Sequence, residues 1–183
     1  MGATVEQSLA NTIALLSRTP AALNALLRDL PNAWTQSNEG GKSWSPYEIV
    51  AHLARTEKHD WIPRLKTMLR AGASIPTLES VIRQPDAQQR SLSELLDEFA
   101  RLREENLREL QTMNLQPADL VRPGNHRSLG PVNVSQLLAT WTTHDLTDLH
   151  QLSRVLAYQY RDAVGAWSAF LGVLKCDAHS APA

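Results

Sequence analysis

The chain of 183 residues is 43% hydrophobic, and its 18 basic and 19 acidic residues give a formal net charge of −1 at pH 7. This length predicts one domain with a full hydrophobic core, the balanced and scattered charges argue against nucleic-acid binding, and the lone Cys176 excludes an intrachain disulfide or a cysteine-based zinc site. No run approaches about 20 uninterrupted apolar residues and Glu6 lies where a signal peptide would be basic, so we expect a cytoplasmic protein without a membrane partner.

Two helical segments are expected before the first connection. Apolar residues recur with a helical period between Thr4 and Leu16. Thr19-Pro20 then offers a cap and a favoured first residue for a second segment, over 21–30. Residues 31–42 are predicted to form a connection, in which Trp34 closes over the core.

The clearest helix start in the sequence is the capping box Ser45-Pro46-Tyr47-Glu48. This helix should break near Asp60, because Pro63 removes a backbone hydrogen bond, and should end at Gly72. One stripe of the helix carries polar residues between apolar neighbours, which is unusual for a solvated face. The stripe consists of Glu48, His52, Thr56 and His59.

A third long helix is predicted to begin at Ser91, with Glu94 completing a second capping box. Its leucines and one phenylalanine form the buried stripe, and its Arg and Glu residues are expected to form the solvated face. Irregular loops are expected before and after this helix, over residues 73–90 and 117–131.

The fourth helix is predicted to begin at Asn133 and to run over 134–160, where there is no Pro or Gly. His144 and Asp148 are four residues apart, so both side chains lie on one face of this helix. His150 is excluded from that face because it lies about 120° round the helix from His144. A short amphipathic segment over 166–174 follows, and the tail over 177–183 is predicted to be disordered.

No segment shows sustained alternation typical of a strand, so we expect an all-α four-helix bundle in one domain over residues 1–176, with a short extra C-terminal helix. Bundles build sites from inward-facing side chains on neighbouring helices. His52 is therefore the natural partner for His144 and Asp148, which gives two imidazoles and a carboxylate with open positions for water or substrate. Taken singly, each residue has a simpler alternative, such as an ordinary core histidine or a local hydrogen-bonded pair.

Two pairs of segments resemble the DinB-like family. They are residues 44–53 with 57–64, and residues 136–146 with 151–155. The resemblance extends from about Thr4 to Leu174 and preserves the order and spacing of these motifs. It implies a bundle of the up-down-down-up type, a homodimer, and a relationship to bacillithiol S-transferases and to the mycothiol-dependent maleylpyruvate isomerase.

The resemblance also implies a divalent metal, most often zinc or nickel, held by one histidine of the second helix and a His-x3-His pair of the fourth. These positions fall on His52, His144 and Asp148, so an aspartate replaces the third histidine. A carboxylate can ligate, and two histidines with one carboxylate also suit iron or manganese. The alternative is that the metal is weak or lost and only the scaffold is kept.

For function, the resemblance implies a metal-dependent enzyme acting on a small molecule, either a thiol S-transferase that uses a low-molecular-weight thiol or a hydrolase. The ion would lower the pKa of a bound thiol or water. Thr56 and His59 are the candidate catalytic residues, because they lie on the His52 stripe and can move protons. The alternative is a non-catalytic dimeric bundle, a stress or binding protein with a degenerate metal site.

Overall fold

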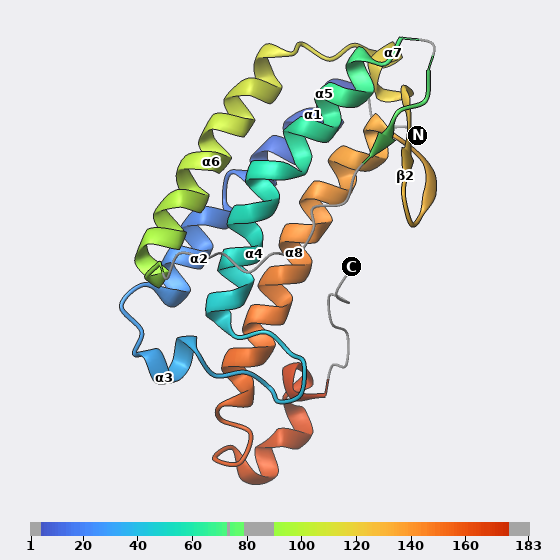
Figure 1. The fold of residues 1–183 in the computed structure, drawn as a ribbon. Coiled ribbons are helices and arrows are strands. Elements are labelled where there is room, and N and C mark those ends of the chain that lie inside the picture. Colours follow the sequence, from blue (N-terminus) through green and yellow to red (C-terminus); the bar gives the residue numbers. More distant parts are fainter. Residues whose placement is uncertain (1–4, 73, 79–89, 176–183) are drawn as a thin grey trace.

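The structure, a computed structural model, describes residues 5–72, 74–78 and 90–175 (Figure 1). Helices dominate it, and a few very short strands lie near one end of the bundle. In chain order, the elements are α1 (Val5–Leu16), α2 (Thr19–Leu27), α3 (Asn32–Thr35), α4 (Pro46–His59), α5 (Trp61–Arg70), β1 (Thr77–Leu78), α6 (Leu92–Thr112), α7 (Pro117–Leu120), β2 (Pro123–His126), β3 (Gly130–Asn133), α8 (Val134–Tyr158), and the 3-10 helices η1 (Gly165–Phe170) and η2 (Gly172–Leu174).

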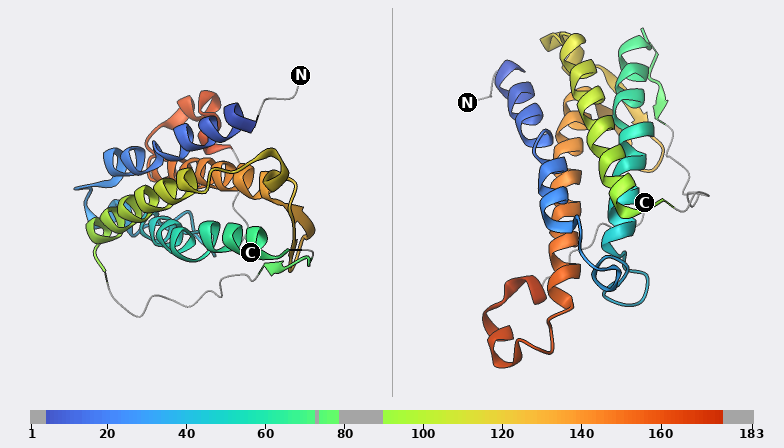
Figure 2. Two further views of the ribbon diagram at one scale, coloured as in Figure 1. Left: turned by 90° about the horizontal axis from the view of Figure 1, so that it is seen from above. Right: turned by 90° about the vertical axis from the view of Figure 1, so that its left-hand side faces the viewer.

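Four rods form the bundle: α1 continued by α2, α4 continued by α5, α6, and α8 (Figure 1). The first and last rods run in one direction and the two middle rods run in the opposite direction, which confirms the predicted up-down-down-up order. Figure 2 shows this arrangement from above and from the side, with the chain after α8 projecting beyond the end of the bundle. No helix among the described residues combines the length and the apolar character needed to cross a membrane.

The three longest helical segments after the first connection begin where the sequence predicts. Ser45, Ser91 and Asn133 each cap a helix, and each takes part in a complete capping box with the third residue of that helix. These boxes satisfy backbone N–H groups that would otherwise have no partner at a helix start. Local sequence therefore determines the starts of α4, α6 and α8.

The Ser91 cap is a testable contribution to stability. Its side chain accepts a hydrogen bond from the backbone N–H of Glu94 at 3.2 Å. Ser91→Ala should therefore lower the free energy of unfolding by about 1 kcal/mol, measured by urea denaturation. Ser93→Ala is the matched control, because Ser93 is exposed in the first turn of the same helix and alanine is the better helix former. A loss of equal size in both variants would contradict the capping role.

The second rod breaks as predicted. Asp60 ends α4 and precedes α5, with φ −103° and ψ −65°, and Pro63 lies in the first turn of α5. After α5 ends at Arg70, Gly72 adopts φ +56°, a left-handed conformation that glycine allows without strain. Trp61, the first residue of α5, is buried in the core.

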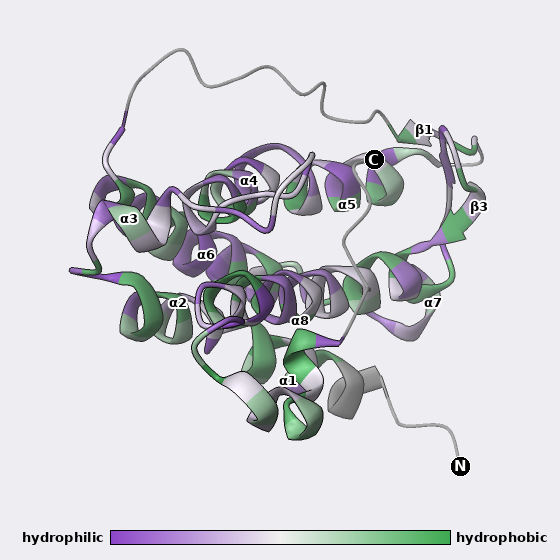
Figure 3. Ribbon diagram, turned by 90° about the horizontal axis from the view of Figure 1, so that it is seen from below, coloured by the Kyte–Doolittle hydropathy of each residue, from purple (hydrophilic) through white to green (hydrophobic). Residues whose placement is uncertain are grey.

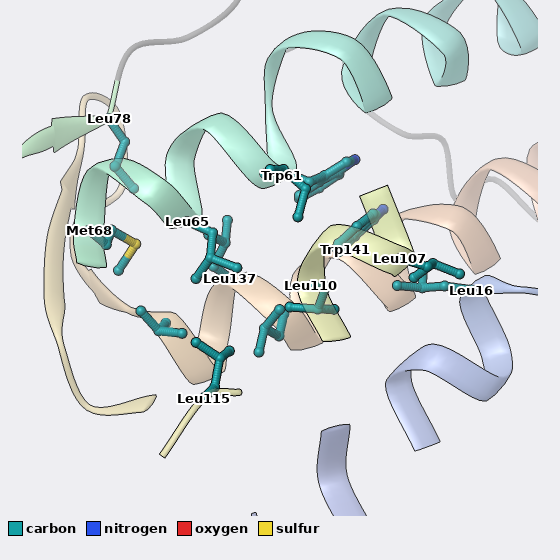
Figure 4. Packing of buried hydrophobic residues seen from close by; sticks show 13 residues of the cluster. Leu16, Trp61, Leu65, Met68, Leu78, Leu107, Leu110, Leu115, Leu137 and Trp141 are labelled. Carbon is teal, nitrogen blue, oxygen red and sulfur yellow. The ribbon is translucent and has the colours of Figure 1, made fainter. Parts of the chain in front are cut away.

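The core consists of two hydrophobic clusters, one toward each end of the bundle. Figure 4 shows the first, in which Trp61 stacks on Trp141 with ring centroids 5.8 Å apart. On α4–α5, α6 and α8, the residues between the positions of the two clusters include the buried, charged Glu57, Arg103 and Asp145. A polar layer thus crosses the middle of the bundle. Seen from below, the helices carry both hydrophilic and hydrophobic residues (Figure 3).

Parts of the predicted loops form short strands. Strands β1, β2 and β3 form a small sheet, in which β1 is parallel to β2 and β2 is antiparallel to β3. The expectation of irregular loops throughout is therefore wrong here, because these two- to four-residue strands are defined by pairing across the chain, as in Thr77 with Asn125. The all-α bundle itself is confirmed.

The C-terminal segment is helical, but it consists of the 3-10 helices η1 and η2, in which no residue is fully buried. Trp167 is 74% exposed and Phe170 is 82% exposed, so neither aromatic side chain is part of the core. Trp34, which was expected to close over the core, is half-buried and packs against Tyr160 at 5.1 Å between ring centroids. The predicted disordered tail, 177–183, lies outside the described residues.

Candidate metal centre

The three predicted ligands converge between α4 and α8. One potential ligand atom from each of His52, His144 and Asp148 lies within 4.8 Å of the other two. The two Nε2 atoms of His52 and His144 are 3.0 Å apart, and Nδ1 of His144 is 3.2 Å from Oδ2 of Asp148. The sequence therefore identified three residues that the fold brings together, although their role as ligands stays a prediction.

The spacing of these atoms suits a divalent ion after a small adjustment. Two nitrogen ligands of a tetrahedral zinc ion, each about 2.05 Å from the metal, are about 3.3 Å apart. The 3.0 Å between the two Nε2 atoms is close to that value. The 4.8 Å limit of the set means that its widest separation must shorten by no more than about 1.5 Å. Rotation of side chains can supply such a change.

The three candidate ligands are largely shielded from solvent. The Asp148 side chain has no exposed surface and that of His144 is 23% exposed. Burial lowers the pKa of His144, with Asp145 opposing this effect and the positive charges of Arg103 and Arg64 adding to it. A lowered pKa keeps the imidazole neutral at pH 7, and the neutral form is the one that binds metal.

Aromatic rings pack against both imidazoles. The Trp44 ring lies 4.8 Å from the His52 ring, centroid to centroid, and Trp61 contacts His144 edge-on at 5.2 Å. Because Trp61 also stacks on Trp141, the wall beside His144 is two indoles deep. These contacts restrict the orientation of the rings and help to exclude water.

A buried ionic network lies next to the three residues. Arg103 donates from Nη1 to Oδ2 of Asp145 at 2.6 Å, and from Nη2 to Oε1 of Glu57 at 2.7 Å and Oδ1 of Asp145 at 3.0 Å. Burial opposes the charge of Arg103, but Glu57 and Asp145 together raise its pKa, so it stays protonated. Since Asp145 follows His144 directly, the network fixes the turn of α8 that carries a predicted ligand.

Neutral donors complete this network. Trp141 donates from Nε1 to Oε1 of Glu57 at 2.7 Å, Asn106 donates to the other Glu57 oxygen at 2.9 Å, and Thr19 donates to Asp145 at 2.6 Å. These bonds stabilise the Glu57 and Asp145 carboxylates, whose two negative charges exceed the single positive charge of Arg103. Helices α2, α4, α6 and α8 all contribute to the network.

The buried position of Arg103 corrects the prediction for its helix. The Arg and Glu residues of α6 were expected to be solvated, but Arg103 is 1% exposed. A signal was present in the sequence, because Phe99, Arg103 and Leu107 follow one another at four-residue intervals and so share one face. A charged residue within an apolar stripe indicates a buried ion pair, and its partners depend on the fold.

The two candidate catalytic residues differ in their surroundings. Thr56 is buried one turn after His52, and its hydroxyl donates to the backbone carbonyl of Leu53 at 3.0 Å. His59 is exposed at the end of α4 and is not part of the three-residue cluster. Glu48, on the same stripe, accepts hydrogen bonds from the backbone and hydroxyl of Ser45. The catalytic roles of Thr56 and His59 therefore stay predictions.

Comparison with known proteins gives a family and a fold. The sequence model of the DinB superfamily matches residues 15–152. Among solved structures, one similar chain is YfiT from Bacillus subtilis, described as a probable metal-dependent hydrolase with an unusual four-helix bundle topology. The two share 18% sequence identity with a TM-score of 0.70, over 88% of this chain and 91% of that one. No curated protein matches the chain significantly.

Proposed function

The chain belongs to the DinB superfamily, and on this basis we propose that it is a metal-dependent hydrolase of a small-molecule substrate. The observation that carries the proposal is the convergence of His52, His144 and Asp148, with one potential ligand atom from each within 4.8 Å of the others. The description of YfiT, a protein of similar fold, as a probable metal-dependent hydrolase supports the same reaction class.

In this proposal His52 and His144 provide two neutral nitrogens and Asp148 provides one negatively charged oxygen. This donor set suits zinc, nickel, iron or manganese, and the resemblance to the DinB-like family favours zinc or nickel among them. When bound, the ion supplies Lewis acidity that lowers the pKa of a water molecule and makes it a nucleophile at neutral pH. The carboxylate balances half of the dication's charge, so a donor set of this kind suits a neutral or singly negative substrate.

The surrounding residues orient the site and limit its water content. Trp44 and Trp61 pack on the imidazoles of His52 and His144, respectively. Thr56 lies one turn from His52 and is the buried residue that we propose hydrogen-bonds to the reacting group, after its hydroxyl leaves the Leu53 carbonyl. His59, exposed at the end of the same helix, is proposed to exchange protons with solvent.

Removal of metal is the direct test. The purified chain, dialysed against zinc, should hold one ion per chain by mass spectrometry of the metal, and should hydrolyse an activated ester such as p-nitrophenyl acetate. Chelation should reduce both the metal content and the hydrolysis by at least about tenfold, and zinc should restore them. A reloaded protein without bound ion, or an unchanged rate after chelation, would contradict the proposal.

The same preparation separates hydrolysis from S-transfer. If a low-molecular-weight thiol is the acceptor, the metal-loaded protein should consume chlorodinitrobenzene only when glutathione or another such thiol is added. We expect the protein to hydrolyse the ester and to show no thiol-dependent consumption of chlorodinitrobenzene above background. The opposite result would keep the metal site and reassign the reaction to thiol transfer.

A further inference from the structure

Gln151 lies on the face of α8 that carries His144 and Asp148. It follows Asp148 by three residues and His144 by seven, so at about 100° per residue its direction differs from theirs by about 60° and 20°. Along the helix axis it lies about 4.5 Å beyond Asp148. Its residue exposure is 3%. The face with the predicted ligands therefore continues into a second buried polar side chain.

The side-chain oxygen of Gln151, Oε1, is buried and has no hydrogen-bond partner among the described residues of the fold. Buried polar atoms are nearly always paired, because leaving one unpaired costs stability. The neighbouring buried residues Leu152 and Val155 pack in the second hydrophobic cluster, where an apolar side chain in place of Gln151 would fit the surroundings. A polar group kept at such a cost on this face points to a hydrogen-bond partner that the described part of the chain does not itself supply.

The positive charge nearest to Gln151 along α8, that of Arg154, is already paired with a carboxylate. Arg154, one turn after Gln151, donates to Oε2 of Glu39 at 2.7 Å, and both side chains are mostly buried. An anionic substrate group would have to compete with Glu39 for this cation. A carboxamide carries no charge and offers one acceptor and two donor hydrogens. Gln151 therefore suits a hydroxyl or amide group rather than a carboxylate or phosphate.

We propose that Gln151 is a specificity-determining residue that hydrogen-bonds to an uncharged hydroxyl or amide group of the substrate, close to Asp148 on the same face of α8. This inference rests on the proposed hydrolase function. It narrows the substrate to a small molecule that carries a polar, non-ionic group near the cleaved bond.

Two probes that differ in one hydroxyl test this assignment. The full chain is loaded with cobalt, and its visible absorption is titrated with butyrohydroxamate and with 4-hydroxybutyrohydroxamate, whose hydroxamate groups bind the metal. The wild-type protein should bind the hydroxylated probe about 3- to 10-fold more tightly, the range of one net hydrogen bond. Gln151→Met, which keeps the length of the side chain, should remove this preference, and Gln151→Leu is the second variant.

Gln159→Leu is the matched control, because Gln159 lies on the same rod at the end of α8, where it donates to the Val155 carbonyl. It should keep the wild-type preference. Equal binding of the two probes by the wild-type protein, or an unchanged preference in Gln151→Met, would overturn the assignment. Cobalt bands are recorded before any probe is added, and their absence from the wild-type protein would overturn the metal site and this inference with it.

The melting temperature separates a substrate-binding role of Gln151 from a structural one. A structural role would lower it in Gln151→Met, whereas the proposed role should not. Replacing a buried amide whose oxygen is unpaired by an apolar side chain of similar size should raise the melting temperature of Gln151→Met. Cobalt affinity should stay within about twofold of the wild-type value, because Gln151 is not one of the proposed ligands. A lower melting temperature combined with unchanged probe selectivity would identify Gln151 as structural.

Discussion

Arg103→Met should lower the free energy of unfolding by about 3–5 kcal/mol, the largest stability effect that we expect from a single substitution in this chain. Arg103 is 1% exposed and is the cation shared by two buried carboxylates, those of Glu57 and Asp145. Without it, two negative charges remain in the middle of the bundle with only neutral donors around them. Burying an unpaired charge is far more costly than losing a surface ion pair.

The matched control is Arg101→Met on the same helix. Arg101 pairs with Glu105 at 2.8 Å, but the two side chains are 58% and 50% exposed. This substitution should change the free energy of unfolding by less than about 0.5 kcal/mol. Urea denaturation of the two variants under identical conditions gives the comparison. Similar losses in both would show that burial does not set the strength of the Arg103 interactions.

A compensated variant tests the charge argument itself. Combining Arg103→Met with Glu57→Gln and Asp145→Asn removes all three charges while nearly preserving shape. If unpaired charge causes the loss, this triple variant should be more stable than Arg103→Met alone by about 2 kcal/mol or more. A triple variant less stable than the single one would indicate that hydrogen-bond geometry, rather than charge, dominates.

Helix boundaries were predictable because their causes are local. Ser45 and Ser91 satisfy backbone N–H groups within their own helices, and Pro63 interrupts the second rod within a few residues of Asp60. The partnership of His52 with His144 and Asp148 was predictable for a similar reason. Helical period defines the inward face of each helix, and a bundle brings such faces together.

Other features depend on partners distant in sequence. The sheet needs Thr77 to meet Asn125, and neither segment has a strand pattern of its own. Arg103 was expected to be exposed because arginine usually is, and its burial requires Glu57 and Asp145 from two other helices. Sequence periodicity locates a residue on a face, but pairing across the fold decides whether a charge can stay there.

We expect Asp148 to decide whether this site can hold a metal, because the resemblance to the DinB-like family predicts a histidine at this position. Asp148→Asn should weaken zinc affinity by at least about 100-fold, since an amide oxygen is a poor zinc ligand and the negative charge is lost. His52→Ala should weaken it at least as much. Asp148→His should keep the affinity within about tenfold of wild type, because it restores three nitrogen ligands.

Competition with a coloured zinc chelator measures all these affinities, and Asp162→Asn is the matched control, because Asp162 is exposed just beyond α8. If Asp148 only orients His144 through the 3.2 Å contact between Oδ2 and Nδ1, Asp148→Asn should cost about 10- to 100-fold, and Asp148→His should not restore the loss. Zinc affinity in Asp148→Asn equal to that of Asp162→Asn would show that the aspartate takes no part in the site.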